Sequence, residues 1–130
     1  MQTLVENIRK PDITFRSDGS IIISASIAKR LSLMPGDAIN VVPDSNEYFL
    51  VARHASRDTQ GKPIASFRNA VHYIKGEHGT MRCSFRKLCN AINFITQSPA
   101  SVLFCGTPRE NFRGFDIAIP IITANNQYNK

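Results

Sequence analysis

The chain has 130 residues, 42% of them hydrophobic, and a net charge of +6 at neutral pH. A chain of this size and composition can bury a core without disulfides, so we expect one domain, or one small domain with an elaboration. It has no apolar run of the ~20 residues that a membrane span needs, and no apolar signal-peptide core at its start. These features predict a cytoplasmic protein without a membrane partner.

Apolar spacing predicts an α+β chain that is mainly β. Short β-branched or alternating apolar runs bounded by turn residues indicate strands, and apolar residues at helical spacing indicate helices. The expected strands are residues 13–16, 21–23, 38–42, 48–51, 80–83, 101–105 and 115–119, and the expected helices are residues 25–31 and 85–95. Turn-rich loops are expected at residues 54–63 and 106–114, whereas residues 64–67 and 70–74 favour neither strand nor helix.

The ends of these elements have their own signals. Ser24 and Ser26 are both candidate N-caps of the first helix, and Pro35-Gly36-Asp37 is expected to stop it. Ser84 is the candidate N-cap of the second helix. Pro120 limits the last strand unless that strand lies at a sheet edge.

The pattern of residues 12–53 resembles a known domain. Gly19, the isoleucine strand, the basic helix, Leu33 and Pro35-Gly36-Asp37 follow one another in the order seen in the swapped-hairpin domain of the AbrB (SpoVT-AbrB) type. That domain occurs in bacterial transition-state regulators and in antitoxins of the MazE kind. The sequence departs from the family pattern at Ser20, where the family usually has arginine, and at Ser24, where it usually has proline.

The resemblance implies a swapped-hairpin β-barrel with short helices. In this family two chains exchange hairpins to close the barrel, so the expected assembly is a homodimer. DNA is the expected partner, and an antitoxin-like role would add a protein partner such as a toxin.

A second part of the chain echoes the first. The segment from Gly19 to Ser24, followed by Lys29-Arg30-Leu31, is similar to the segment from Gly79 to Ser84, followed by Arg86-Lys87-Leu88. Residues 79–122 would then form a degenerate, pseudo-duplicated second half that lets one chain complete a barrel alone, or dimerise into something larger. Chance similarity between two short strand-to-helix junctions is the alternative.

The remaining segments divide the chain further. Residues 1–11 are expected to be a mixed lead-in to the first strand. Residues 54–78 are expected to be a basic linker or loop region, and residues 123–130 a disordered tail.

The positive charge is concentrated in the middle of the chain. Residues 53–90 carry eight Lys and Arg against two acidic residues, whereas residues 1–52 sum to −1 and residues 91–130 to +1. Such asymmetry indicates a polyanionic partner, of which nucleic acid is the commonest. A solvated basic face that aids solubility is the alternative.

Six basic residues are candidates for contact with DNA phosphates: Arg16, Lys29, Arg30, Arg82, Arg86 and Lys87. The resemblance implies that the first three, near the first turn and on the first helix, meet the DNA backbone. The other three are expected in the equivalent zone of the second half. Lysine and arginine on a helix surface are often merely solvated, which is the competing interpretation.

The sequence gives little support for metal binding or catalysis. His72, His78, Cys83 and Cys89 are separated by five, four and five residues, unlike the close ligand pairs of structural zinc sites. There is no nucleophile elbow, phosphate loop or dinucleotide fingerprint. We therefore expect no enzyme activity, metal or cofactor, and expect buried free thiols at Cys83, Cys89 and Cys105.

Two functions remain as expectations. The first is a DNA-binding protein, either a transcription regulator or antitoxin-like, that holds DNA mainly through phosphates. The second is a protein–protein interaction module on the same barrel that has lost DNA binding. Ser20 and the net charge of residues 1–52 favour the second function, and the basic middle segment favours the first.

Overall fold

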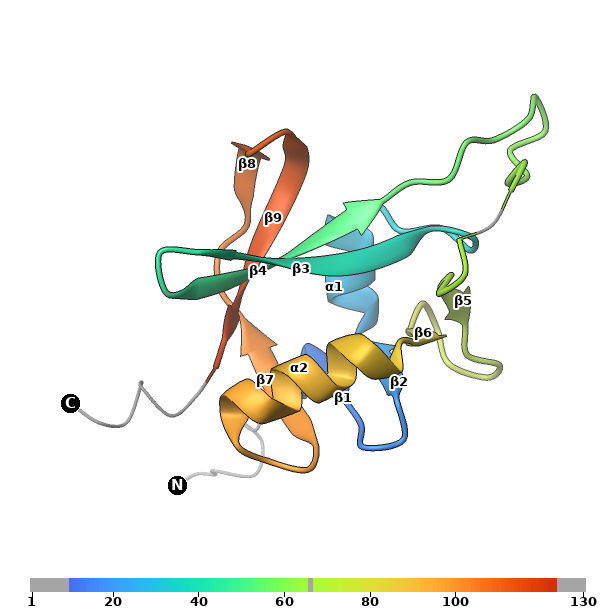
Figure 1. Cartoon of the computed structure of the whole chain (residues 1–130). Coiled ribbons are helices and arrows are strands. Elements are labelled where there is room, and N and C mark those ends of the chain that lie inside the picture. The colour runs from blue at the N-terminus through green and yellow to red at the C-terminus, as the bar shows by residue number, and fades with distance from the viewer. Residues whose placement is uncertain (1–9, 66, 124–130) are drawn as a thin grey trace, which may run out of the picture.

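The computed structural model describes residues 10–65 and 67–123, which form a mainly β fold with two helices (Figure 1). The strands are β1 (Ile13–Phe15), β2 (Ser20–Ile23), β3 (Ala38–Asp44), β4 (Glu47–Arg53), β5 (His72–Tyr73), β6 (Met81–Ser84), β7 (Ser101–Cys105), β8 (Arg109–Phe112) and β9 (Phe115–Ile122), and the helices are α1 (Ala25–Arg30) and α2 (Arg86–Thr96). The predicted lead-in up to residue 9 and the predicted disorder of residues 124–130 lie outside the described residues. No helix in the described part of the chain is long and apolar enough to cross a membrane.

The strands pair antiparallel into one curled sheet with the shape of a half-barrel. Their order is β3-β4-β9-β7-β1-β2-β6-β5, with β8 beside β9. Two backbone hydrogen bonds connect the segments next to the end strands: Gly36 N donates to Val71 O (3.1 Å), and Val71 N donates to Asp37 O (2.7 Å). The sheet therefore curls until the two ends of its strand order approach each other.

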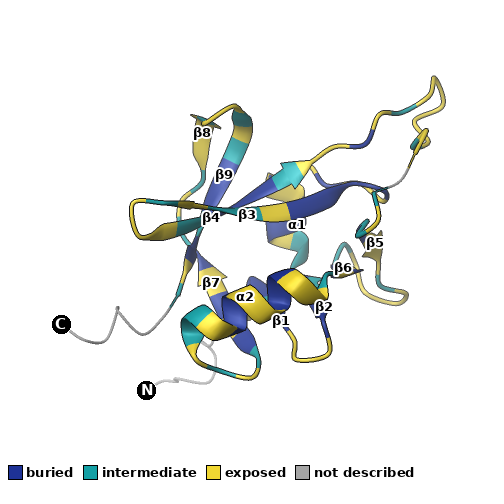
Figure 2. Cartoon of the chain, viewed as in Figure 1, coloured by how far each residue is buried: buried dark blue, intermediate teal, exposed yellow. Residues whose placement is uncertain are grey.

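The core lies on the inner face of this sheet. Its strand residues, each at most 5% exposed, include Ile13, Phe15, Ile21, Ile23, Met81, Cys83 and Leu103. Helix α2 covers them with Leu88, Cys89 and Ile92, and Figure 2 shows its opposite side exposed. Full burial of such a side chain contributes about 1.5–3 kcal/mol. All three cysteines are buried and free, as the sequence predicts.

The two halves of the chain have the same order of elements. The first half runs β1-β2-α1-β3-β4, and the second runs β5-β6-α2-β7-β9 with β8 inserted before its last strand. Strand β2 pairs with β6, and β4 pairs with β9, so matching strands of the two halves lie side by side. The echo between residues 19–24 and 79–84 therefore corresponds to two segments that pair directly with each other.

A glycine before each paired strand allows the two halves to pack closely. Gly19 has φ +94°, and a Cβ added there would lie 3.0 Å from the Cβ of Arg86. Gly79 has φ +86°, and a Cβ added there would lie 2.9 Å from the Cβ of Ala25. Each glycine thus packs against the first residue of the other half's helix, at a φ that side chains other than glycine rarely adopt.

Two helix ends differ from the sequence prediction, the C-terminal end of α1 and the N-terminal end of α2. Helix α1 ends at Arg30, before the expected stop at Pro35-Gly36-Asp37, because Ser32 takes the left-handed conformation (φ +55°) and Leu33 N donates to Ala28 O. Ser24 is the N-cap of α1, with its side chain accepting from Ile27 N at 3.2 Å. Ser84 is not the N-cap of α2, because it belongs to β6 and pairs with Ser20.

Two predictions near the C-terminus also need correction. The expected loop at residues 106–114 contains β8, which forms a hairpin with β9 and places the ring of Phe112 4.4 Å from that of Phe49. Strand β9 continues through Pro120 to Ile122. The carbonyl of Pro120 accepts from Gly106 N, which lies just beyond the end of β7. Pro120 has no N–H to donate on this side, but β7 has already ended there.

Candidate nucleic-acid interface

All six basic residues predicted to contact DNA are exposed. Among the residues that the structure describes, none of the six forms an ion pair with a carboxylate. Other arginines of the chain are paired: Arg57 with Asp37, Arg109 with Glu47, and Arg113 with Asp44. The predicted residues are therefore available to an anionic partner, whereas these other arginines already have carboxylate neighbours.

Three of the six lie around the β1–β2 turn, namely Arg16, Arg82 and Arg86, and Lys87 follows Arg86 in α2. We call these four residues the turn cluster. Arg16 opens the turn, where its N–H donates to Ser20 O (2.9 Å) and its carbonyl accepts from Gly19 N (3.1 Å). Arg82 lies on β6 beside β2, and Arg86 packs its Cβ against Gly19. The pairing of β2 with β6 brings these residues together from positions about 70 apart in sequence.

One carboxylate, that of Asp18, lies within the turn cluster. Its Oδ1 accepts hydrogen bonds from the hydroxyl of Ser20 (2.6 Å) and from the N–H of Ser20 (2.9 Å). These bonds, the hydroxyl first, lower the pKa of Asp18, and attraction from Arg16 and Arg82 adds to the effect. Ser20 therefore holds the turn through Asp18. Four cations against one carboxylate leave this surface positive.

The start of α2 is electrostatically unfavourable on its own. Its N-cap is Phe85, whose side chain forms no capping hydrogen bond, and its first turn has no acidic residue. Instead Arg86 and Lys87 are the first two residues of the helix. Cations at a helix N-terminus oppose the helix dipole, which favours negative charge at that end. A phosphate at this position would satisfy both the cations and the uncapped N–H groups.

The start of α1 shows the opposite arrangement. Ser24 caps it, and its cations, Lys29 and Arg30, lie in the last turn, where the helix dipole favours them. Because β2 and β6 are antiparallel, the two helices begin at opposite ends of this strand pair. The expected equivalence of Lys29 and Arg30 with Arg86 and Lys87 is therefore not reproduced, since the two pairs occupy opposite ends of their helices.

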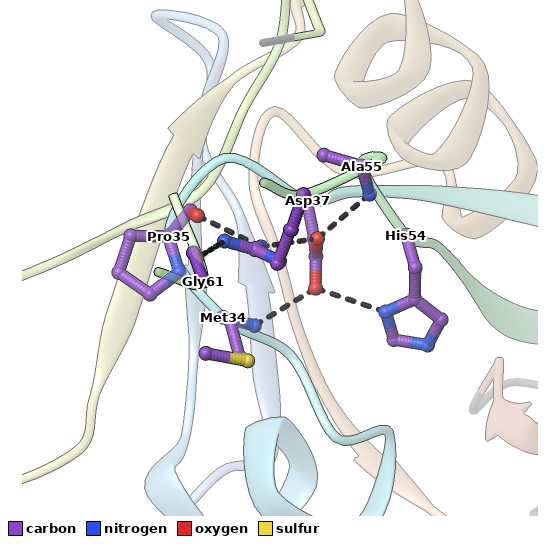
Figure 3. Close-up of polar contacts among 7 residues, drawn as sticks. Met34, Pro35, Asp37, His54, Ala55 and Gly61 are labelled. Atoms are coloured by element: carbon purple, nitrogen blue, oxygen red, sulfur yellow. Dashed lines mark hydrogen bonds and ion pairs between the residues drawn. The ribbon is translucent and has the colours of Figure 1, made fainter. Parts of the chain in front are cut away.

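A buried ionic cluster, which the sequence reasoning missed, centres on Asp37 (Figure 3). The carboxylate is 1% exposed and accepts four hydrogen bonds. They come from Met34 N (2.9 Å), Ala55 N (2.9 Å), the His54 ring (2.9 Å) and an Nη of Arg57 (2.7 Å). Burial raises the pKa of Asp37, but these hydrogen bonds outweigh burial and hold the pKa below its usual value.

The Asp37 cluster positions the loop that follows β4. Arg57 also donates to Pro35 O (3.0 Å) and Gly61 O (3.1 Å), so one side chain joins the Pro-Gly-Asp turn to the tip of the loop. Arg57 also pairs with Pro63 in an isolated bridge. Figure 1 shows this loop extending from the end of β4. The signal was the aspartate in the turn itself. Its three partners outside the turn, however, lie 17 to 20 residues away, and no spacing rule connects them to Asp37.

The histidines and cysteines considered for metal binding do not gather into a site among the described residues. Burial raises the pKa of Cys83 to about 12, and burial also raises the pKa of Cys89, so both remain thiols near neutral pH. His72 and His78 are exposed on β5 and in the turn before β6. Within residues 10–65 and 67–123, no three His, Cys, Asp or Glu side chains gather as metal ligands.

Comparisons of the chain with protein-family models, curated proteins and solved structures found no significant match. The case for a nucleic-acid interface therefore rests on the residues of this chain.

Proposed function

We propose that this protein binds DNA, mainly through phosphate contacts made by the turn cluster, and acts as a transcription regulator or antitoxin-like protein. The observation that carries the proposal is the start of α2. Two exposed cations occupy the first turn of an uncapped helix, where they oppose the dipole and have no carboxylate partner among the described residues. A local arrangement that disfavours the isolated fold is typical of a binding site.

Two further features support a phosphate surface. Arg16 and Arg82 lie beside the same turn, so four cations come from three separate segments. The planar guanidinium groups of the three arginines and the ammonium of Lys87 on its flexible stem suit phosphate oxygens. Phosphate contacts fix the position of a protein on DNA but read no sequence, so any preference for an operator would come from groove shape.

We also propose that the fold is an AbrB-like barrel in which one chain supplies both halves. The ordered residues of the 12–53 pattern support it, as does the pairing of β2 with β6 and of β4 with β9. The homodimer that the resemblance implies stays a prediction. Because the two halves pair within one chain, a dimer would not need to exchange hairpins.

The competing function is a protein–protein interaction module. One observation favours it: Val102, Phe104 and Ile122 are exposed on the outer face of β7 and β9, with Phe104 and Ile122 directly paired. Exposed apolar side chains on neighbouring strands are typical of contact surfaces, although this group is small.

The deciding experiment is fluorescence anisotropy of a labelled mixed-sequence DNA duplex, titrated with protein at low and near-physiological salt. Binding that weakens steeply with salt is expected, and the double variant Arg86→Glu/Lys87→Glu should reduce both the affinity and the salt dependence. Lys62→Glu/Lys75→Glu is the matched control, because it changes the net charge equally at exposed lysines outside the turn cluster. Absence of binding at low salt, or equal losses in both double variants, would contradict the proposal.

A further inference from the structure

A surface hollow of about 700 Å³ lies away from the turn cluster. It forms where the residues before β1, the exposed side of α1 and the turn after β7 meet. Four of its lining residues have donor side chains and are exposed: Lys10, Ser26, Arg30 and Thr107. The hollow therefore combines two cations with two hydroxyls from three separate parts of the chain.

The two cations of the hollow are available for a ligand. Neither Lys10 nor Arg30 forms an ion pair with any carboxylate in the described part of the chain. Ser26 and Arg30 are four residues apart on α1, so they lie on the same face of the helix, one above the other. Their neighbour Lys29 is also exposed and carries the same charge as Arg30, but it does not line the hollow.

One carboxylate, that of Asp12, lies at the floor of the hollow and has a structural role. Asp12 is 5% exposed, and its Oδ2 accepts from Cys105 N at 2.8 Å. Its own N–H donates to Leu103 O at 3.0 Å, which holds β1 against β7. The accessible rim above it is cationic, and the formal charge of the hollow, two cations against one carboxylate, remains positive.

We propose that this hollow is a second, separate binding site, for the phosphate group of a phosphoester. The guanidinium of Arg30 and the ammonium of Lys10 would share the phosphate oxygens, with hydroxyls of Ser26 and Thr107 donating to them. The volume is much larger than a phosphate needs and falls in the range of small-molecule sites, so it also admits the group that the phosphate esterifies. Pro11 and Pro108 provide apolar surface for that group.

This site does not depend on the proposed DNA surface. The hollow lies at the start of β1 and the end of β2, whereas the turn cluster lies at the end of β1 and the start of β2. Loss of one site therefore leaves the other in place, and each can be tested without the other.

The test is a two-dimensional NMR titration of the full chain with sodium phosphate, compared with sodium chloride at equal ionic strength. Phosphate should shift the amide signals of Ser26 and Thr107, and chloride should not. Arg30→Gln should weaken the binding at least about tenfold, since it removes a charge-assisted hydrogen bond. Lys29→Gln, the matched control on the same helical turn, should stay within about twofold of the wild type.

The remaining titrations distinguish the source of the phosphate. Adenosine monophosphate that shifts the same amides, while a DNA duplex does not, assigns the site to a free phosphoester. A duplex that shifts them, and loses affinity in Arg30→Gln but not in Lys29→Gln, assigns it to a nucleic-acid phosphate. The proposal is overturned if phosphate and chloride act alike, or if the two variants, each with a wild-type-like spectrum, weaken binding equally.

Discussion

The carboxylate of Asp37 and the guanidinium of Arg57 are 2.7 Å apart, and together they join the Pro-Gly-Asp turn to the loop that follows β4. Asp37 is 1% exposed, and Arg57 is 18% exposed. Removal of a buried carboxylate that accepts four hydrogen bonds lowers stability, because each donor then loses its acceptor.

We expect Asp37→Ala to lower the free energy of unfolding by about 2–4 kcal/mol, since it leaves two N–H groups without their acceptor and the partly buried guanidinium of Arg57 without a counter-ion. Urea denaturation followed by circular dichroism measures this loss. The control is Asp116→Ala, an exposed carboxylate that the structure places outside any ion pair among the described residues. Equal effects of the two substitutions would show that the Asp37 cluster does not stabilise the fold.

The stabilisation by Asp37 should depend on pH. Its pKa is lower in the folded chain than in the unfolded chain, so its contribution is complete above the unfolded value of about 3.9 and is lost as the pH falls through the folded value. The stability difference between the wild type and Asp37→Asn should therefore narrow below about pH 4. A difference that stays constant from pH 6 to pH 3 would mean that the hydrogen bonds do not favour the ionised form.

The cations at the start of α2 should lower stability in the absence of a ligand. We expect Arg86→Glu and Lys87→Glu each to raise the free energy of unfolding by about 0.3–1 kcal/mol, because a carboxylate suits the helix N-terminus. The same variants should lose DNA affinity. Thermal unfolding and anisotropy, measured on the same samples, test both statements, and a variant that loses stability instead would indicate a structural role for the cations.

The close packing of the two halves can be tested with a matched pair of glycines. Gly79 and Gly76 have similar positive φ values, +86° and +82°, but only Gly79 has a neighbour within 4 Å of an added Cβ. Both alanine variants should be destabilised by the strained φ, by about 1 kcal/mol. Gly79→Ala should lower the free energy of unfolding by measurably more than Gly76→Ala, because its added Cβ would meet that of Ala25. Equal losses in denaturant melts would argue against this contact.

Pairing of the halves within one chain predicts that folding does not require a second chain. The free energy of unfolding should therefore stay constant when the protein is diluted about a hundredfold, whatever mass light scattering reports. A stability that falls on dilution would instead show that folding depends on association, as in a barrel closed by exchanged hairpins.

Local patterns in the sequence were sufficient to predict most of the strands and both helices. The isoleucine run of β2, the cap at Ser24 and the hairpin between β3 and β4 depend on neighbours a few residues apart. The burial of all three cysteines also followed from composition. Two of the errors occurred where a distant contact decides: Ser84 extends β6, where it pairs with Ser20, and β8 forms where Phe112 packs on Phe49.

The candidate sites divide in the same way. Charge and resemblance were enough to select the six basic residues, because lysine and arginine can be identified in any sequence and are usually exposed. Only the tertiary structure separated them, placing Arg16, Arg82, Arg86 and Lys87 around one turn and Arg30, without Lys29, in the hollow. The same holds for Asp37, whose partners outside its own turn are 17 to 20 residues away. The physical reason is that a local pattern sets how each segment folds, whereas strand pairing across the chain decides which side chains meet.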